Sequence, residues 1–252
     1  MRKASTIVLL ADRCKGSGFD VLMIRRHAKA RSMAGLYAFP GGCLDEEDGT
    51  VDKSLLALKK CAIRELHEET GCSLNATGKA FTDAPLSYDA EGLLCPFAHW
   101  ISPAQEKYRY DTWFFATQLA NTDDVRDLKF TQQDSELEDI KWVSPQEALT
   151  LHNNLDEPFT LPPPTLVTLD YFANFDSAAK VMNAISCYSY NPTQSVPIIE
   201  PIRKIGADGA IGSMYIGSNK VHLPNGKHDL KVFKDVLPVY IGDEYAKDFV
   251  AP

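Results

Sequence analysis

Two apolar runs separated by a small polar turn open the chain, a pattern that predicts an antiparallel hairpin. Residues 6–11 and 19–25 are rich in β-branched and apolar side chains, and Lys15-Gly16-Ser17-Gly18 lies between them. Glycine and serine in such a connection favour a tight turn between two strands. Further strand-like runs cover residues 93–101, 108–119 and 140–143.

Three segments carry a helical pattern instead. The longest predicts a helix over residues 54–70, and Gly71 behind it is suited to a left-handed helix end. A short helix is expected over residues 146–151, and a longer one over residues 166–185, after the prolines of residues 161–164. Strands interspersed with helices place the fold in the mixed α/β or α+β class.

The proline run is also the clearest interruption of the pattern along the chain. We therefore expect a domain over residues 1–156 and an extension over residues 157–252 that packs on the core. Turns are predicted in the extension at Asp208-Gly209 and Asn225-Gly226. The extension could cap a pocket or form the surface of a homodimer, and the sequence leaves both open.

Composition narrows the function classes. Of the 252 residues, 44% are apolar and 24% are charged, which excludes a disordered or collagen-like chain. The formal net charge is −8, and a long Lys/Arg run is absent from the sequence, so binding to a nucleic-acid backbone is not expected. A small phosphorylated ligand remains compatible with this charge, because one pocket can be basic on an acidic protein.

Cysteine usage and the chain ends bear on the compartment. The six cysteines form no Cys-X-X-Cys pair, which predicts reduced thiols in a cytoplasmic setting. The apolar stretch at residues 7–11 is too short for a membrane helix and lacks a signal-peptide pattern. Residues 249–252 match no recognised targeting signal. A cytoplasmic protein without a membrane partner is therefore expected.

Three glutamates dominate the last turns of the longest predicted helix. At about 100° per residue, Glu65, Glu68 and Glu69 fall within one arc of the helix surface. Carboxylates crowded in this way repel one another, and a divalent cation bound between them would offset that repulsion. Ligation by oxygen alone suits Mg²⁺ or Mn²⁺. A solvated acidic helix face is the alternative interpretation of these three residues.

A wider motif surrounds these glutamates. Phe39-Pro40-Gly41-Gly42, followed by Arg64-Glu65-Leu66 with Glu68, Glu69 and Gly71, resembles the Nudix box. This resemblance implies a Nudix fold, with a mixed sheet between helices, and hydrolysis of a nucleoside diphosphate linked to another group. It also implies metal binding by Glu65, Glu68, Glu69 and the carbonyl of Gly41, with Arg64 orienting the carboxylates.

The spacing inside the motif departs from the family pattern. Gly42 and Arg64 lie 22 positions apart, eight more than in the family's usual form. Counted forward from Gly42, the family's first glutamate falls on Asp48, whereas counted backward from Arg64 it falls on Leu56. Glu47 or Asp48 could supply the missing carboxylate.

A narrower resemblance lies upstream. Residues 22–45 look like the signature of coenzyme A diphosphatases within the Nudix family, with Arg26, Arg31 and Gly35 at the expected spacing. The sequence has Ile24 and His27 where that signature has Thr and Ser. The resemblance implies coenzyme A or an acyl-CoA as substrate, cut at the diphosphate to 3′,5′-ADP and a 4′-phosphopantetheine part.

The same segment supplies candidate substrate contacts. Arginine makes forked hydrogen bonds to phosphate, so Arg25, Arg26 and Arg31 are expected to contact the phosphates of the substrate. For Arg31, pairing with the acidic loop at Asp45 is the alternative. The resemblance also places Phe39 and Gly42 next to the substrate.

Residues 134–139 form an acidic segment before Trp142 that offers candidates for the general base. Many Nudix enzymes use a glutamate in that setting, which implies Glu136 as first choice and Glu138 as second. In other branches of the family, the residue at Glu65 or a hydroxide that bridges the metal ions does this work. A solvated acidic loop is the alternative for Glu136 and Glu138.

Two other functions remain open at this stage. The departures at Ile24 and His27 favour a substrate such as ADP-ribose, a nucleotide sugar or a dinucleoside polyphosphate. Leu56 and the insertion favour a module that binds a nucleotide without cutting it. The three helix glutamates count against this second possibility.

Overall fold

The structure is a computed structural model of the chain. It describes residues 1–28, 34–82, 84–104, 106–120, 125–130, 137–154, 159–186, 196 and 198–200, and the backbone of residues 202–204, 213–216 and 219–221. Arg31, Glu136 and the turns predicted at Asp208-Gly209 and Asn225-Gly226 lie outside the described residues.

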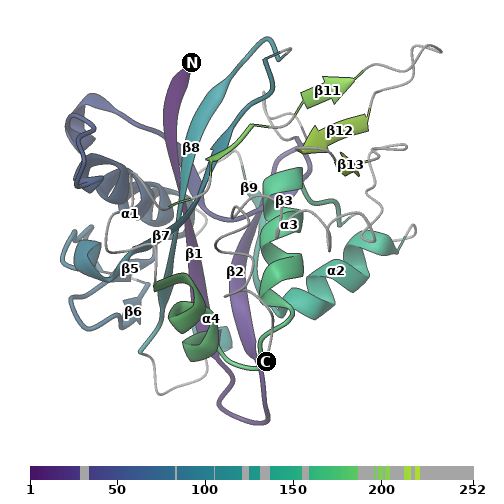
Figure 1. Ribbon diagram of the computed structural model, residues 1–252. Coiled ribbons are helices and arrows are strands. Elements are labelled where there is room, and N and C mark those ends of the chain that lie inside the picture. The colour runs from purple at the N-terminus through teal and green to yellow at the C-terminus, as the bar shows by residue number, and fades with distance from the viewer. Residues whose placement is uncertain are drawn as a thin grey trace.

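One mixed sheet of eight strands forms the centre of the molecule (Figure 1). Strand β1 (Arg2–Asp12) lies in its interior and pairs in parallel with β8 (Tyr110–Gln118). On its other side β1 pairs antiparallel with β2 (Phe19–Arg26) and with β4 (Gly41–Cys43). The remaining strands are β3 (Tyr37–Ala38), β7 (Cys95–Ile101), β9 (Leu137–Val143) and β10 (Ile198–Ile199).

The predicted hairpin and the strand-like runs are confirmed. Leu10 pairs with Val21 across the two antiparallel strands β1 and β2. The turn between them contains Gly16 and Gly18, both with positive φ, the backbone conformation that glycine adopts at little cost. The three later runs form β7, β8 and β9, with ends a few residues from the predicted positions.

The longest predicted helix is α1 (Leu56–Thr70), and it ends at Gly71 in the left-handed conformation, as expected. The short predicted helix is α2 (Pro145–Asn153), which begins with a hydrogen bond from the Glu147 backbone N–H to the Ser144 hydroxyl.

The single helix predicted over residues 166–185 is wrong. Two helices occupy this region, α3 (Pro163–Phe172) and α4 (Ala178–Ile185). Prolines form the first turn of α3, where a helix leaves the backbone N–H groups without partners in any case. At the other end of α3, the Asn174 side chain donates to the carbonyls of Asp170 and Tyr171, which ends the helix.

The second of these helices begins with one local side-chain cap and one from a distant part of the chain. The Ser177 hydroxyl accepts from the Lys180 backbone N–H, and the Asp12 carboxylate, at the end of β1, accepts from the Ala178 backbone N–H at 2.8 Å. These caps explain why a new helix starts at residue 178.

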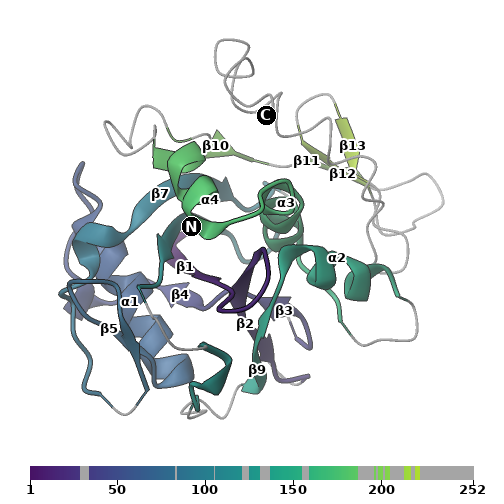
Figure 2. The same ribbon diagram turned by 90° about the horizontal axis from the view of Figure 1, so that it is seen from below.

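The helices cover both faces of the sheet (Figure 2). Helix α1 lies on one face, whereas α3 and α4 lie on the other, with α2 beside α3. Side chains from both layers and the sheet form one hydrophobic core, which includes the fully buried Phe115, Leu58 and Phe172. The expected fold class, a mixed sheet between helices, is therefore confirmed.

Short elements complete the chain. A two-stranded ladder of β5 (Ser73–Leu74) and β6 (Ala80–Phe81) follows α1, and η1 (Glu46–Asp48), η2 (Glu91–Leu93) and η3 (Val125–Asp127) are single 3₁₀ turns. Strands β11 (Ile202–Lys204), β12 (Ser213–Ile216) and β13 (Asn219–Val221) form a separate antiparallel sheet.

The C-terminal part of the described chain contributes to the same core. Leu166, Phe172 and Val181 are buried in it, and β10 extends the sheet by pairing in parallel with β7. The division into residues 1–156 and 157–252 stays a prediction. Within the described part of the chain, none of the helices has the length and apolar character needed to span a membrane.

Candidate active site

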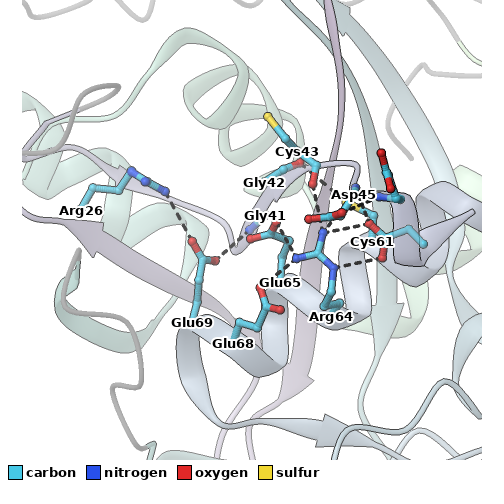
Figure 3. A network of polar contacts seen from close by, with 12 residues as sticks. Arg26, Gly41, Gly42, Cys43, Asp45, Cys61, Arg64, Glu65, Glu68 and Glu69 are labelled. Carbon is cyan, nitrogen blue, oxygen red and sulfur yellow. Dashed lines mark hydrogen bonds and ion pairs between the residues drawn. The ribbon is translucent and has the colours of Figure 1, made fainter.

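The site lies where α1 packs against the short strand β4. Strand β4 contains Gly41 and Gly42, and the last two turns of α1 carry Glu65, Glu68 and Glu69 (Figure 3). Gly41 and Gly42, called the glycine turn below, are separated from the helix glutamates by more than twenty residues in sequence. The structure brings them together, as the motif predicts.

Both glycines are required by close contacts. A Cβ atom on Gly42 would lie 2.4 Å from the Glu65 carboxylate, and a Cβ atom on Gly41 would lie 2.4 Å from the Ser5 carbonyl oxygen. Real Cβ atoms do not approach other atoms so closely. The missing side chain of Gly42 is thus the space that the Glu65 carboxylate fills.

Glu69 is the most buried of the three glutamates, with 3% of its side chain exposed. Its Oε2 accepts a hydrogen bond from the Gly41 backbone N–H at 2.9 Å. Its Oε1 lies 3.4 Å from Nη1 of Arg26, the last residue of β2. Glu69 therefore joins the helix to the glycine turn and to β2.

Glu65 and Glu68 both contact Arg64. The Arg64 Nη1 donates to Glu65 Oε1 at 3.0 Å and to Glu68 Oε2 at 2.8 Å. Burial raises the pKa of the Glu65 carboxyl above its usual value, although the Arg64 charge opposes this shift. Glu68 differs in position, because 52% of its side chain is exposed.

Asp48 is the strongest partner of Arg64. Nε and Nη2 of Arg64 donate to the two Asp48 carboxylate oxygens at 3.0 and 2.9 Å, and the Asp48 side chain has no exposed surface. This hydrogen bonding raises the pKa of the guanidinium, so Arg64 stays charged. Nη2 also donates to the Cys43 carbonyl oxygen at 3.0 Å. Arg64 is held in one position by these bonds.

The candidates for the early carboxylate of the motif differ in position. Asp48, the residue found by counting forward from Gly42, contacts Arg64, whereas Leu56 lies exposed at the start of α1. The Asp45 backbone N–H donates to Asp48 within the 3₁₀ turn, and Glu47 is exposed. The role of Asp48 as the early carboxylate stays a prediction.

Arg25 and Glu138 come together on the neighbouring strands β2 and β9. Arg25 Nη1 lies 3.5 Å from Glu138 Oε2, and Glu138 Oε1 accepts from the Ala28 backbone N–H at 3.0 Å. His27 Nε2 lies 3.8 Å from the same oxygen. Glu138, the second candidate base, thus binds the segment that follows Arg26.

A contact network near the glycine turn was not foreseen. The Tyr37 hydroxyl donates to Asp139 at 2.7 Å, and the ring stacks on Phe159 with 4.0 Å between ring centroids. Lys141 pairs with Asp139 at 3.1 Å and lies over the Tyr37 ring. These contacts hold β3 just before the glycine turn. The contacts of Tyr37 reach residues more than 100 positions along the chain, so neighbouring residues in the sequence do not predict them.

The residues around the glycine turn fit a divalent cation by their chemistry. Among the described residues, no three His, Cys, Asp or Glu side chains lie together as ligands of one ion. Glu65 and Glu69, however, both approach the turn at Gly41 and Gly42. Mg²⁺ is commonly held by one or two carboxylates together with substrate phosphates, and such a set is available here. The roles of Gly41, Glu65, Glu68 and Glu69 as ligands stay predictions.

Two expected substrate contacts have clear positions. Gly42 lies against Glu65, and Phe39 is buried in the hydrophobic core. The phosphate-binding role expected for Arg25 and Arg26 stays a prediction, and Arg31 and Glu136 lie outside the described residues.

Comparisons with known proteins agree with this geometry. The family model described as "NUDIX domain" matches residues 1–161. The chain is 26% identical to a Caenorhabditis elegans protein provisionally named nudix hydrolase 7, with 88% of this chain and 77% of that protein covered. The crystal structure of a NUDIX hydrolase from Alicyclobacillus acidocaldarius superimposes with a TM-score of 0.58 and 23% identity. That likeness covers 74% of this chain and 97% of the other, and it concerns the fold.

Proposed function

The chain belongs to the NUDIX domain family and is a Nudix hydrolase of nucleoside diphosphate derivatives, and we propose that its substrate is coenzyme A or an acyl-CoA. The reaction would hydrolyse the diphosphate bond and release 3′,5′-ADP and 4′-phosphopantetheine or its acyl form. This membership favours a hydrolase over a nucleotide-binding module without activity.

The observation that carries the hydrolytic part is the meeting of Glu65, Glu69 and Arg26 at the glycine turn. Two carboxylates approach the turn formed by Gly41 and Gly42, and a partly exposed arginine lies at its edge. Nudix hydrolases in general use divalent metal ions. A bound ion supplies a water of lowered pKa and neutralises charge on the diphosphate.

Residues of the chain would position the carboxylates around that ion and supply fixed positive charge for the phosphates. Arg64, held by Asp48, fixes Glu65 and Glu68 along one edge of α1. Arg25 and Arg26 supply positive charge for the phosphates from the end of β2. Fixed charges of this kind need little rearrangement during the reaction.

The acceptor of the water proton has three candidates. Glu65 has a pKa raised by burial, which makes it a better proton acceptor near neutral pH. Glu138 already accepts a hydrogen bond from the Ala28 backbone. Glu136 remains the first choice implied by the family resemblance.

The choice of coenzyme A rests on the resemblance of residues 22–45 to the coenzyme A diphosphatase signature. Coenzyme A carries a diphosphate and a separate 3′-phosphate, and Arg25, Arg26 and Arg31 could pair with these groups. Arginine rather than lysine suits such forked contacts.

Identification of products tests the proposal. The full chain is incubated with Mg²⁺ and a mixture of coenzyme A, acyl-CoAs, dephospho-CoA, ADP-ribose and nucleotide sugars, and the products are identified by mass spectrometry. We expect 3′,5′-ADP and phosphopantetheine as the main products. A higher kcat/KM for dephospho-CoA than for coenzyme A would argue against recognition of the 3′-phosphate.

A second substrate class is favoured by one position. Ile24, which replaces the threonine of the coenzyme A signature, is fully buried and offers no hydrogen bond to a ligand. ADP-ribose, a nucleotide sugar or a dinucleoside polyphosphate is therefore the second candidate. The same product assay distinguishes the two classes.

A further inference from the structure

Arg26 lies on a carboxylate that a divalent ion would need. Its Nη1 is 3.4 Å from Glu69 Oε1, while the Gly41 backbone N–H donates to Glu69 Oε2 at 2.9 Å (Figure 3). Both oxygens of Glu69 thus face positive or donor groups. Glu69 is buried, whereas 21% of the Arg26 side chain is exposed.

The strand explains why Arg26, and not its neighbour, reaches Glu69. Successive side chains of a strand point to opposite faces of the sheet. Arg26 contacts α1 on one face, while Arg25 lies over the Tyr37 ring and pairs with Glu138. The pairing of β2 with β9 also shifts register between these two arginines.

Arg64 is held much more tightly than Arg26. Its side chain is 10% exposed, and its guanidinium donates to Asp48, to the Cys43 carbonyl and to the helix glutamates at 2.8 to 3.0 Å. Arg26 is more exposed, and its contact with Glu69 is longer. Of these two arginines, Arg26 is the one whose guanidinium can change partner at lower cost.

A divalent ion and Arg26 repel each other when both lie on Glu69. A divalent ion bound to Glu69 would lie within a few ångströms of the Arg26 guanidinium, and like charges at such distances repel strongly. A diphosphate would relieve this repulsion, because it can bind the ion and accept forked hydrogen bonds from arginine at the same time.

We propose that Arg26 is a latch: it holds Glu69 in the metal-free protein and turns to the substrate diphosphate when a divalent ion takes Glu69. Binding of the ion and binding of the diphosphate then favour each other, and each increases the affinity for the other by the same factor. This inference rests on the proposed function, and Arg26 is in this sense a positioning residue.

Mn²⁺ affinity of the full chain tests the latch without any turnover. Isothermal titration calorimetry gives the Kd of Mn²⁺ for the unaltered chain and for Arg26→Gln, Arg26→Lys and Arg25→Gln. Each titration is done with and without methylenediphosphonate, a diphosphate analogue that is not hydrolysed. In the titrations without the analogue, Arg25→Gln is the matched control, because it removes the same charge from the adjacent residue, which contacts Tyr37 and Glu138 and not Glu69.

We expect Arg26→Gln to tighten Mn²⁺ binding without the analogue, because it removes the competitor for Glu69. The tightening should be about fivefold, in the usual range for coupled sites. Arg26→Lys keeps the charge and should stay within about twofold of the unaltered chain, as should Arg25→Gln. The analogue should tighten Mn²⁺ binding to the unaltered chain by about tenfold, and much less in Arg26→Gln.

A double-variant cycle separates the latch from a general effect of charge. In a Glu69→Gln background, Mn²⁺ binding is weaker and depends on Glu65 and Glu68. The additional change Arg26→Gln should then leave the Kd of Mn²⁺ unaltered, because the carboxylate that Arg26 holds is gone. Circular dichroism and thermal unfolding show that each variant is folded.

The latch is overturned if Arg26→Gln behaves like Arg25→Gln in the titrations without the analogue, if its effect persists in the Glu69→Gln background, or if the unaltered chain does not bind Mn²⁺. The product assay separates this result from the proposed function. A chain that cleaves a diphosphate but shows no Arg26 effect refutes the latch alone. A chain that cleaves none of the compounds but shows the Arg26 effect refutes the proposed function alone.

Discussion

Arg64 and Asp48 form an ion pair with two hydrogen bonds in the interior of the protein. The donor–acceptor distances are 3.0 Å from Nε and 2.9 Å from Nη2, and the Asp48 side chain is completely buried. The remaining guanidinium nitrogen donates to Glu65 and Glu68. One end of Arg64 is thus fixed by the loop before α1, and the other end holds the carboxylates of the site.

Asp48→Asn tests this pair. The variant leaves part of a buried positive charge uncompensated, so we expect the free energy of unfolding to fall by about 3 to 5 kcal/mol. Urea denaturation measures the change. The control is Glu47→Gln, at the exposed neighbouring position, where a change within about 0.5 kcal/mol is expected. Equal losses of unfolding free energy in Asp48→Asn and Glu47→Gln would mean that the ion pair of Arg64 and Asp48 does not stabilise the fold.

Glu69→Gln should remove most of the turnover while the protein still folds. Glutamine retains an oxygen that can accept from the Gly41 backbone N–H, but it lacks the charge that would bind a divalent ion. We expect kcat to fall by about 10²-fold or more, as for other losses of charge stabilisation. Steady-state kinetics with the best substrate, together with thermal unfolding, check both parts. Undiminished activity would refute the assignment of Glu69, and Glu46→Gln, at an exposed position, is the control.

Gly42→Ala should disturb the site through Glu65. The new methyl group would lie 2.4 Å from the Glu65 carboxylate, so that carboxylate must move away from the turn. We expect a loss of activity of about 10²-fold, as for displacement of a positioned group by about 1 Å. Gly92→Ala is a matched control, because a Cβ atom there meets nothing within 4 Å. If the two variants have equal activity, Gly42 is not needed for the position of Glu65.

Asp111 should make stability depend on acid pH. Burial acts to raise the pKa of Asp111, but hydrogen bonds with Lys3 and His99 outweigh it and hold the pKa below the ordinary 3.8. The Asp111 carboxylate therefore takes up a proton more readily in the unfolded chain than in the folded protein. The stabilisation by Asp111 is complete above the pKa that it has in the unfolded chain, and it is lost as the pH falls through the lower pKa of the folded protein.

Unfolding free energies measured between about pH 6 and pH 2.5 show this loss as a slope. We expect Asp111→Asn to have a smaller slope than the unaltered chain, whereas Asp127→Asn, at an exposed position, should keep it. An unchanged slope in Asp111→Asn would show that other carboxyls cause the acid sensitivity.

Phe159→Ala should show how strongly the segment after α2 is attached. The Phe159 ring is buried and stacks on Tyr37, so its removal leaves a cavity beside β3. We expect a loss of about 3 to 5 kcal/mol in the free energy of unfolding. Phe81→Ala, at a more exposed phenylalanine, is the control and should cost much less. A small effect at Phe159 would mean that β3 does not depend on this contact.

Local patterns predicted the parts of the fold that depend on neighbouring residues. The first hairpin follows from two apolar runs joined by the glycine-containing residues 15–18, and the end of α1 follows from Gly71. The meeting of the glycine turn with Glu65 and Glu69 was also predicted, but from the resemblance to a motif and not from periodicity.

Features that depend on distant contacts could not be predicted in this way. The helix expected over residues 166–185 is divided partly because Asp12, at the end of β1, caps α4. Composition alone gives no sign of such a cap. Counting along the motif left Asp48 and Leu56 as alternatives, and it gave no sign of the ion pair that Asp48 forms with Arg64.

The hydrophobic core does not end where the family match ends. The match covers residues 1–161, but Phe172 of α3 lies against Phe97 of β7, and α4 packs on β7 and β8. A fragment that ends at residue 161 would expose the apolar surface of this side of the sheet to solvent, and such a surface promotes self-association. The boundary of sequence likeness is therefore a poor guide for choosing an expressible minimal version of the enzyme.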